Sequence, residues 1–240
     1  AARDFVLGTH ILNGKGEILS FGGEVMKNVA GYDVSRLMTG AMGSLGVILD
    51  VSLKVLPRPD MEITLAQELD LADALSKLQS WARKPLPISA SCFYNNTLYI
   101  RLSATAEAVT AAKTVIGGDE LEVGNAFWHS IKEQSHDFFA DSRSLWRLSI
   151  DANAPALTIA GNYLYEWGGA LRWLLSDETA DSIQHAAAEL GGHATLFRTP
   201  SHRDDVFQAL PAPLMQLHLK LKQAFDPKGI LNPGRMYREL

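Results

Sequence analysis

Short apolar runs separated by turn residues fill the first part of the chain, a pattern typical of β-strands. Strands are predicted over residues 5–12, 17–21 and 46–56. Asn13-Gly14 lies between the first two runs, and this pair favours the type I′ turn of a β-hairpin. Asp33 is placed to cap a short helix over residues 34–38. Pro57 and Pro59 each remove a backbone donor after the third strand, so we place a domain boundary at residue 57.

From residue 61 the pattern changes to strands that alternate with amphipathic helices. Strands are predicted over residues 63–68, 88–94, 98–103, 145–150, 163–166, 169–175 and 193–198, and helices over residues 71–84, 106–116, 125–139 and 178–190. This order predicts an α+β domain over residues 58–212, in which helices cover one face of an antiparallel sheet. A last amphipathic helix is predicted over residues 214–225, within a C-terminal segment of residues 213–240.

Composition narrows the class of protein. With 240 residues, 47% of them apolar and 20% charged, the chain has the content of a soluble globular protein with two folded units. The net charge of −5 and the lack of a Lys/Arg run exclude a nucleic-acid partner. Cys92 is the single cysteine, so no intrachain disulfide forms and a reducing compartment is the default. The longest uncharged apolar stretch, residues 37–49, is too short to span a bilayer directly.

Three glycines, Gly40, Gly43 and Gly46, recur between the predicted helix and the strand that follows it. One interpretation is a tight helix-to-strand turn. The other is a backbone that lies against a flat ligand, because a side chain at these positions would stand in the way. Ser44 is the hydroxyl residue within the turn. The sequence contains neither a G-x-G-x-x-G nor a G-x-x-x-x-G-K-[ST] phosphate loop.

Three predicted strands of the middle domain each carry one arginine, namely Arg101, Arg147 and Arg172. Strand alternation predicts that Arg172 shares a face with the small residues Gly168 and Ala170, which would leave open space beside its guanidinium. A planar guanidinium in such space suits a carboxylate that accepts two hydrogen bonds. The alternative is an arginine on the solvent side of a half-exposed sheet. We rank Arg172 first among the candidate substrate contacts, followed by Arg147 and Arg101.

Four segments carry a resemblance to a known family. They are RDFVLG at residues 3–8, FGGEVMKNVAGYD at residues 21–33, WGGALRW at residues 167–173 and NPGRMY at residues 232–237. Together they resemble the FAD-linked oxidase superfamily of the PCMH type, which includes vanillyl-alcohol oxidase and the D-2-hydroxy-acid dehydrogenases, and within it the glycolate oxidase E-subunit family. The resemblance implies that residues 1–57 form the second part of an FAD-binding domain. It further implies that residues 58–212 form an inserted cap domain and that residues 213–240 return to the FAD-binding domain.

The resemblance also implies which residues lie near the cofactor. The implied FAD neighbours are Tyr32, Gly40, Gly43, Ser44, Gly46, Val47, Ile48 and Asn232. Tyr32 lies in the loop before the glycine turn, where Lys27 and Asp33 are more simply explained as a solvated lysine and a helix cap. The glycine turn and Val47-Ile48 would run along the adenosine end of FAD. Asn232 would lie beside the flavin ring.

The activity that the resemblance implies is oxidation of 2-hydroxy acids, glycolate to glyoxylate, by a complex with a sister flavin subunit and an iron–sulfur subunit. Catalytic relatives carry an H-x-G-D-G-N-x-H signature, whereas residues 191–195 here read GGHAT, so no catalytic residue is assigned. No metal site is expected, because His129 and His136 lack a carboxylate at ligand spacing. Two alternatives stay open: a self-sufficient FAD-dependent D-2-hydroxy-acid dehydrogenase, and a structural subunit without cofactor. The implied location is cytoplasmic, or peripheral at the inner membrane through the complex.

In the family, a glycine-rich loop that holds the FAD pyrophosphate precedes the segment that resembles residues 3–8. The chain begins without such a segment. We therefore expect it to be the C-terminal portion of a longer protein that binds FAD, and to be inactive and to bind FAD weakly or not at all by itself. Residues 1–57 and 214–240 are expected to pack on each other and to expose apolar surface.

Overall fold

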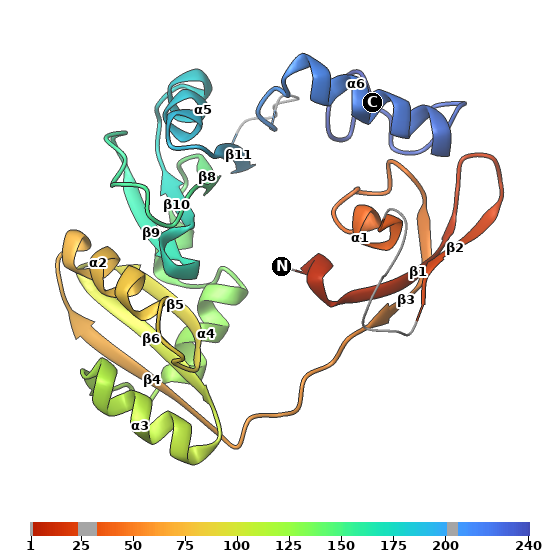
Figure 1. Cartoon of the computed structure of the whole chain (residues 1–240). Helices are drawn as coiled ribbons and strands as arrows, with labels where there is room; N and C mark the ends of the chain where they lie inside the picture. Colours follow the sequence, from red (N-terminus) through yellow and green to blue (C-terminus); the bar gives the residue numbers. More distant parts are fainter. Residues whose placement is uncertain (1, 24–32, 201–205) are drawn as a thin grey trace. The chain divides into compact units, whose positions relative to one another are not determined.

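The computed structural model describes residues 2–23, 33–200 and 206–240, and the chain forms two compact units (Figure 1). Unit 1 combines Ala1–Pro57 with Ala209–Leu240, and unit 2 comprises Arg58–Gln208. The first boundary is at the residue expected from the two prolines. The second lies four residues before the expected residue 212. No helix in the described part of the chain combines the length and apolar character needed to cross a membrane.

Unit 1 is built on a three-stranded antiparallel sheet in the order β2-β1-β3. The elements are η1 (Ala2–Phe5), β1 (Val6–Leu12), β2 (Ile18–Gly22), α1 (Val34–Met38), β3 (Val47–Leu53) and α6 (Ala212–Phe225). As expected, Asp33 caps α1, because its carboxylate accepts the backbone N–H of Arg36 at 3.1 Å. Leu221 and Phe225 of α6 pack against a buried cluster that includes Ile11 of β1.

The β1–β2 turn differs from the expected type I′ geometry. Such a turn requires positive φ at both central residues, whereas positive φ occurs here at Gly16 and at neither Asn13 nor Gly14. The turn is held instead by the Asn13 Oδ1 atom, which accepts the backbone N–H groups of Lys15 and Glu17 at 2.9 and 3.0 Å. An Asn side chain that bonds to the backbone two residues ahead is a common turn-former, and here it outweighs the dipeptide preference.

Unit 2 contains an eight-stranded sheet in the order β11-β8-β10-β9-β5-β6-β4-β7, in which all neighbours are antiparallel. The strands are β4 (Met61–Glu68), β5 (Ile88–Tyr94), β6 (Thr97–Ala104), β7 (Asp119–Glu120), β8 (Leu145–Ser149), β9 (Asn162–Glu166), β10 (Leu171–Leu175) and β11 (His193–Arg198). The mixture of helices and antiparallel sheet confirms the predicted α+β class. The helices are α2 (Leu71–Trp81), α3 (Ala106–Ile116), α4 (Gly124–Lys132) and α5 (Ala180–Glu189).

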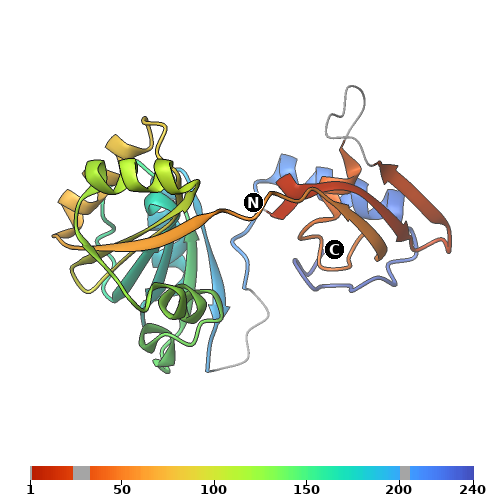
Figure 2. The ribbon, with the colours of Figure 1, turned by 90° about the horizontal axis from the view of Figure 1, so that it is seen from below.

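The helices of unit 2 lie on both faces of the sheet, which corrects the expectation of one covered face. Helices α2, α3 and α5 cover the face that carries Tyr165 and Leu174. Helix α4 and the 3-10 turn η2 (Asp137–Ala140) pack on the opposite face, against Leu171, Trp173 and Leu175. Figure 2 shows α3, in yellow-green, and α4, in green, on opposite sides of the sheet. Strand β10 is therefore apolar at nearly every position, since both of its faces are buried.

Several elements are shorter than predicted, and for two of them the backbone gives the reason. The helix predicted over residues 125–139 ends at Lys132, because Gln134 adopts φ +55° and the chain reverses before η2. The strand predicted over residues 169–175 begins at Leu171, because Trp167–Gly169 form the 3-10 turn η3. Trp167 in this turn has φ +51°, which is uncommon for a bulky residue. The alternation assumed for residues 167–170 is thus wrong, whereas that of residues 171–175 holds.

Candidate functional site

The glycine turn of unit 1 closes on itself through backbone and hydroxyl bonds. Ser44 donates its backbone N–H to the Ala41 carbonyl at 2.9 Å and its hydroxyl to the same carbonyl at 2.6 Å. Gly40 and Gly43 have φ of +87° and +72°, so both positions favour glycine. Gly46 has a packing reason instead, because a Cβ there would lie 3.0 Å from Cδ1 of Ile11. At Gly40 and Gly43 the backbone is therefore compatible with both interpretations, a tight helix-to-strand turn and a surface that lies against a flat ligand.

The structure brings Asn232 to this turn from the other end of the chain. Its side-chain amide donates to the carbonyl of Met42 at 2.6 Å. A Cβ at Gly43 would lie 2.8 Å from the Asn232 Nδ2 atom. Asn232 itself has φ +41°, in the left-handed region that asparagine tolerates better than most residues. Two of the sequence-predicted residues, Gly43 and Asn232, thus form one local arrangement.

A buried ion pair, which was not predicted from the sequence, contacts both the glycine turn and the segment before Asn232. The Lys222 ammonium is 2.8 Å from Oδ2 of Asp226, one helical turn later. It also donates to the carbonyls of Ser44 and Leu231 at 2.8 and 2.5 Å. Burial alone would raise the pKa of Asp226, but Lys222 and the N–H groups of Leu231 and Ile230 lower this pKa below its ordinary value of 3.8. The i, i+4 spacing was visible in the sequence, but its burial was not.

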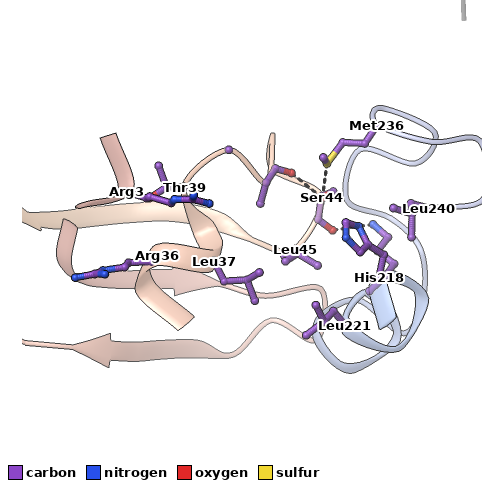
Figure 3. Close-up of a pocket in the computed structure, with 13 residues that line it drawn as sticks. Arg3, Arg36, Leu37, Thr39, Ser44, Leu45, His218, Leu221, Met236 and Leu240 are labelled. Carbon is purple, nitrogen blue, oxygen red and sulfur yellow. Dashed lines mark hydrogen bonds between the residues drawn. The ribbon is translucent and has the colours of Figure 1, made fainter. Parts of the chain in front are cut away.

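A cavity of about 350 Å³ lies within unit 1 (Figure 3). Of the sequence-predicted residues, Gly40 and Ser44 line it, while Gly43, Gly46, Val47, Ile48 and Asn232 are not among its lining residues. Figure 3 shows Arg3 and Arg36 at one end and His218 at the other, with Leu45 between them. Val47 and Ile48 lie on β3 and are 49% and 47% exposed. Tyr32 and Lys27 lie outside the described residues.

Arg172 does not have the open space that the sequence suggested. It is fully buried on the face covered by α2, α3 and α5, and its guanidinium donates to the carbonyls of Gly169, Pro155 and Ala154. The same group lies 5.2 Å from the ring centre of Tyr165. Its donors are thus directed at protein carbonyls and an aromatic face, which is the arrangement of a structural arginine. The error arose because alternation assigns a residue to a face without telling whether helices cover that face.

Arg147 lies on the opposite face of the sheet and is half-buried. Its guanidinium stands 5.5 Å from the ring centre of Trp167, an indole that is 59% exposed. It has no hydrogen-bond partner within residues 2–23, 33–200 and 206–240. Burial lowers the pKa of Arg147 below its ordinary value, and the Glu166 carboxylate opposes this shift only in part. Arg147 is therefore a cation with donors available for an anionic ligand.

Glu166 accompanies Arg147 on this face. Its Oε2 atom accepts the indole N–H of Trp173 at 2.7 Å. Burial raises the pKa of Glu166, while the Trp173 hydrogen bond and Arg147 partly oppose that rise. A ligand carboxylate at Arg147 would therefore meet a glutamate whose negative charge is already disfavoured.

Arg101 is the third predicted arginine and is more fully engaged than Arg147. Its Nε atom donates to the Ser89 hydroxyl at 2.9 Å and lies 3.7 Å from the Glu62 carboxylate. Its guanidinium is 5.6 Å from the ring centre of Trp128 in α4, which places it on the same face as that helix. In the described part of the chain no three His, Cys, Asp or Glu side chains are grouped so that they could hold a metal.

Known proteins with a similar sequence segment or fold indicate the class of protein to which this chain belongs. Residues 202–236 match the family described as FAD linked oxidases, C-terminal domain. The fold is similar to that of alkyldihydroxyacetonephosphate synthase, with a TM-score of 0.58 and 12% identity, over 97% of this chain and 53% of that one. It is also similar to p-cresol methylhydroxylase with substrate bound, with a TM-score of 0.58 and 16% identity, over 96% of this chain and 64% of that one. These likenesses define an FAD-linked oxidase fold.

Relatives with similar sequences identify the family within this class of proteins. The chain is 49% identical to glycolate oxidase subunit GlcE of Escherichia coli (strain K12), over 100% of this chain and 67% of the relative. It is 26% identical to glycolate oxidase subunit GlcD of Bacillus subtilis (strain 168), over 98% of this chain and 63% of the relative. The chain belongs to the GlcE family of FAD-linked oxidases, which confirms the resemblance found in the sequence. It spans about two thirds of the length of these curated relatives.

Proposed function

We propose that the whole protein is an FAD-binding subunit of a complex that oxidises 2-hydroxy acids, glycolate to glyoxylate. The observation that carries this proposal is the 49% identity to subunit GlcE, which extends over the entire chain. When bound, FAD supplies the redox chemistry by accepting two electrons from the CH–OH group. In the proposed assembly the residues of this chain hold the cofactor of this subunit.

The residues of unit 1 fit a flat cofactor. Among the described residues, no heavy atom lies within 4 Å of the place where a Cβ of Gly40 would be, so its backbone offers room for a ligand. Val47 and Ile48 offer exposed apolar surface on β3, next to the turn. In the proposed arrangement the turn from Gly40 to Gly46, Val47, Ile48 and Asn232 contribute to the FAD site. Tyr32 stays a candidate on the strength of the family resemblance alone.

In the alternative arrangement, in which this chain itself binds the substrate, Arg147 of unit 2 is the first candidate for the ligand of the substrate carboxylate. Its donors have no partner in the described part of the chain, and the exposed Trp167 indole borders it. Arg101 ranks second because Ser89 and Glu62 already engage it. Arg172 becomes the last of the three, because its donors are directed at backbone carbonyls.

The proposal assigns substrate oxidation to a sister flavin subunit and electron transfer onward to an iron–sulfur subunit. The motive is that the H-x-G-D-G-N-x-H signature of catalytic relatives is absent from this sequence. The GlcE and GlcD relatives carry the names of different subunits of glycolate oxidase, which supports a multi-subunit assembly. A cytoplasmic location, or a peripheral one at the inner membrane through the complex, is part of the same proposal.

The test uses the whole protein, purified alone and with its partners. Flavin absorbance that co-elutes with the protein purified alone is expected, and its absence at saturating FAD would contradict the proposal.

A second experiment asks which subunit binds the substrate. It uses Arg147→Lys in the assembled complex, because an ammonium cannot make the paired hydrogen bonds of a guanidinium. If this chain binds the substrate, the KM for glycolate should rise about tenfold, which corresponds to about 1.4 kcal/mol. If the sister subunit does so, KM should not change. Arg143→Lys, at an ion pair with Asp141, is the matched control.

A further inference from the structure

Lys222 and Asp226 form a buried pair whose polar atoms bind backbone from two separate segments of unit 1. The two side chains are 9% and 0% exposed. Lys222 donates to the carbonyl of Ser44, in the glycine turn, and to the carbonyl of Leu231, next to Asn232. Asp226 Oδ2 accepts the backbone N–H of Leu231 at 2.7 Å. The pair therefore connects the glycine turn to the Asn232 loop through three backbone bonds.

This arrangement determines the position of two segments that are otherwise joined by few polar contacts. Asn232 reaches the turn through one hydrogen bond to Met42. Gly43 and Asn232 approach closely enough that a Cβ at Gly43 would lie 2.8 Å from the amide nitrogen. A small displacement of either segment would break this fit. The buried pair bonds to the backbone of both segments.

We propose that Lys222 and Asp226 are positioning residues, which fix the spacing between the glycine turn and the Asn232 loop and thereby set the affinity of the protein for FAD. The inference rests on the proposed function, since it assumes that these segments contact the cofactor. A buried ion pair is weak evidence of a stabilising role, because replacing both partners by apolar residues is often neutral. The specific backbone partners are what suggest positioning.

The experiment compares a double variant, which carries both Lys222→Met and Asp226→Leu, with the unaltered whole protein. Removing both charges avoids leaving one of them buried and unpaired, so the unfolding midpoint should change little. Amide hydrogen exchange of the apoprotein should become at least tenfold faster at Leu231 and at residues 44–46, because the three backbone bonds are lost. The dissociation constant for FAD should rise at least tenfold. Lys220→Met, at an exposed lysine on the same helix, should change neither quantity.

The outcomes separate this inference from the proposed function. Unchanged exchange together with unchanged FAD affinity in the folded double variant would overturn the positioning role. If the unaltered protein binds no FAD, the proposed function fails, and so does the claim that the pair sets cofactor affinity. Should the double variant not fold, Lys222→Met alone removes the two bonds to the Ser44 and Leu231 carbonyls and leaves a carboxyl that can take up a proton. An FAD affinity of that variant equal to that of the unaltered protein would then count against the proposal.

Discussion

Gly14 and Asp226, more than two hundred positions apart in the sequence, are in direct contact. A Cβ at position 14 would lie 2.8 Å from the Cα atom of Asp226 and closer still to its Oδ1 atom. That oxygen is buried and accepts no hydrogen bond from the described residues. The backbone N–H of Gly14 donates to the carbonyl of Phe225 at 2.9 Å. Glycine is required at position 14 for space, because the end of α6 packs on the hairpin turn.

The first prediction follows from this contact. Gly14→Ala should destabilise the protein by about 1–3 kcal/mol, the usual cost of overpacking a buried site. The unfolding free energy from urea titration measures it. Gly23→Ala is the control, because a Cβ there meets no atom of the described residues within 4 Å and the residue has no positive φ. Equal stability of the two variants would show that the Gly14–Asp226 contact yields without strain.

The second prediction concerns the glycine turn. Gly40→Ala and Gly43→Ala both place a side chain at positive φ, at about 1–2 kcal/mol each. Only the second also drives a Cβ against the Asn232 amide. Gly43→Ala should therefore raise the dissociation constant for FAD about tenfold, which is the scale of one displaced hydrogen bond, in addition to its effect on stability. Fluorescence titration of the whole protein with FAD measures it, and an affinity of Gly43→Ala equal to that of the unaltered protein would contradict a role for Asn232.

The third prediction tests the structural role of Arg172. Arg172→Lys should lower the unfolding free energy by about 3 kcal/mol, because charge-assisted hydrogen bonds are worth about 1.5–3 kcal/mol each and one ammonium cannot reach all three carbonyls. Arg143→Lys should change it by less than about 0.5 kcal/mol, since that ion pair is near the surface. Chemical denaturation measures both. A stable Arg172→Lys variant with altered KM would instead restore Arg172 as a substrate ligand.

The fourth prediction is a pH dependence. Burial raises the pKa of Glu166 above its ordinary value of 4.5, so the folded protein holds this proton more tightly than the unfolded chain. As the pH rises from the unfolded-state value through the folded-state pKa, ionisation of the partly buried carboxyl lowers the stability. Glu166→Gln keeps an acceptor for Trp173 and removes this loss. The stability of the variant relative to the unaltered protein should therefore increase as the pH rises above the ordinary glutamate pKa of 4.5, in urea titrations. A difference independent of pH would contradict the prediction.

Local features of the fold were predictable from the sequence, and long-range ones were not. The helix over residues 106–116 was predicted to the residue, and in the structure the Thr105 side chain caps its first turn. The helix after Gly124 was predicted too long, because nothing in the spacing signals the positive φ of Gln134. The face on which Arg172 lies followed from alternation within β10. Whether helices covered that face depended on α2 and α3, which pack there from far away in the sequence, and on the direction in which α5 folds back after β10.

For the candidate site, the glycine turn and Asn232 were found through motifs, since their residue types follow from backbone geometry. The Lys222–Asp226 pair was missed because a lysine and an aspartate four apart on an amphipathic helix usually form an exposed pair. Its burial depends on the Ser44 and Leu231 carbonyls, which come from elsewhere in the chain. Arg147 was ranked below Arg172 for a related reason, because a shortage of hydrogen-bond partners is a property of the folded structure.

The composition of unit 1 from the first and last parts of the chain has a consequence for synthesis on the ribosome. Leu221 and Phe225 of α6 complete the cluster around Ile11 of β1, so this core cannot close until the whole of Arg58–Gln208 has been translated. Until then the apolar cluster around Ile11, with Met38 and Leu45, lacks the helix that packs against it. Nascent chains that pause before residue 212 are therefore the species most in need of a chaperone.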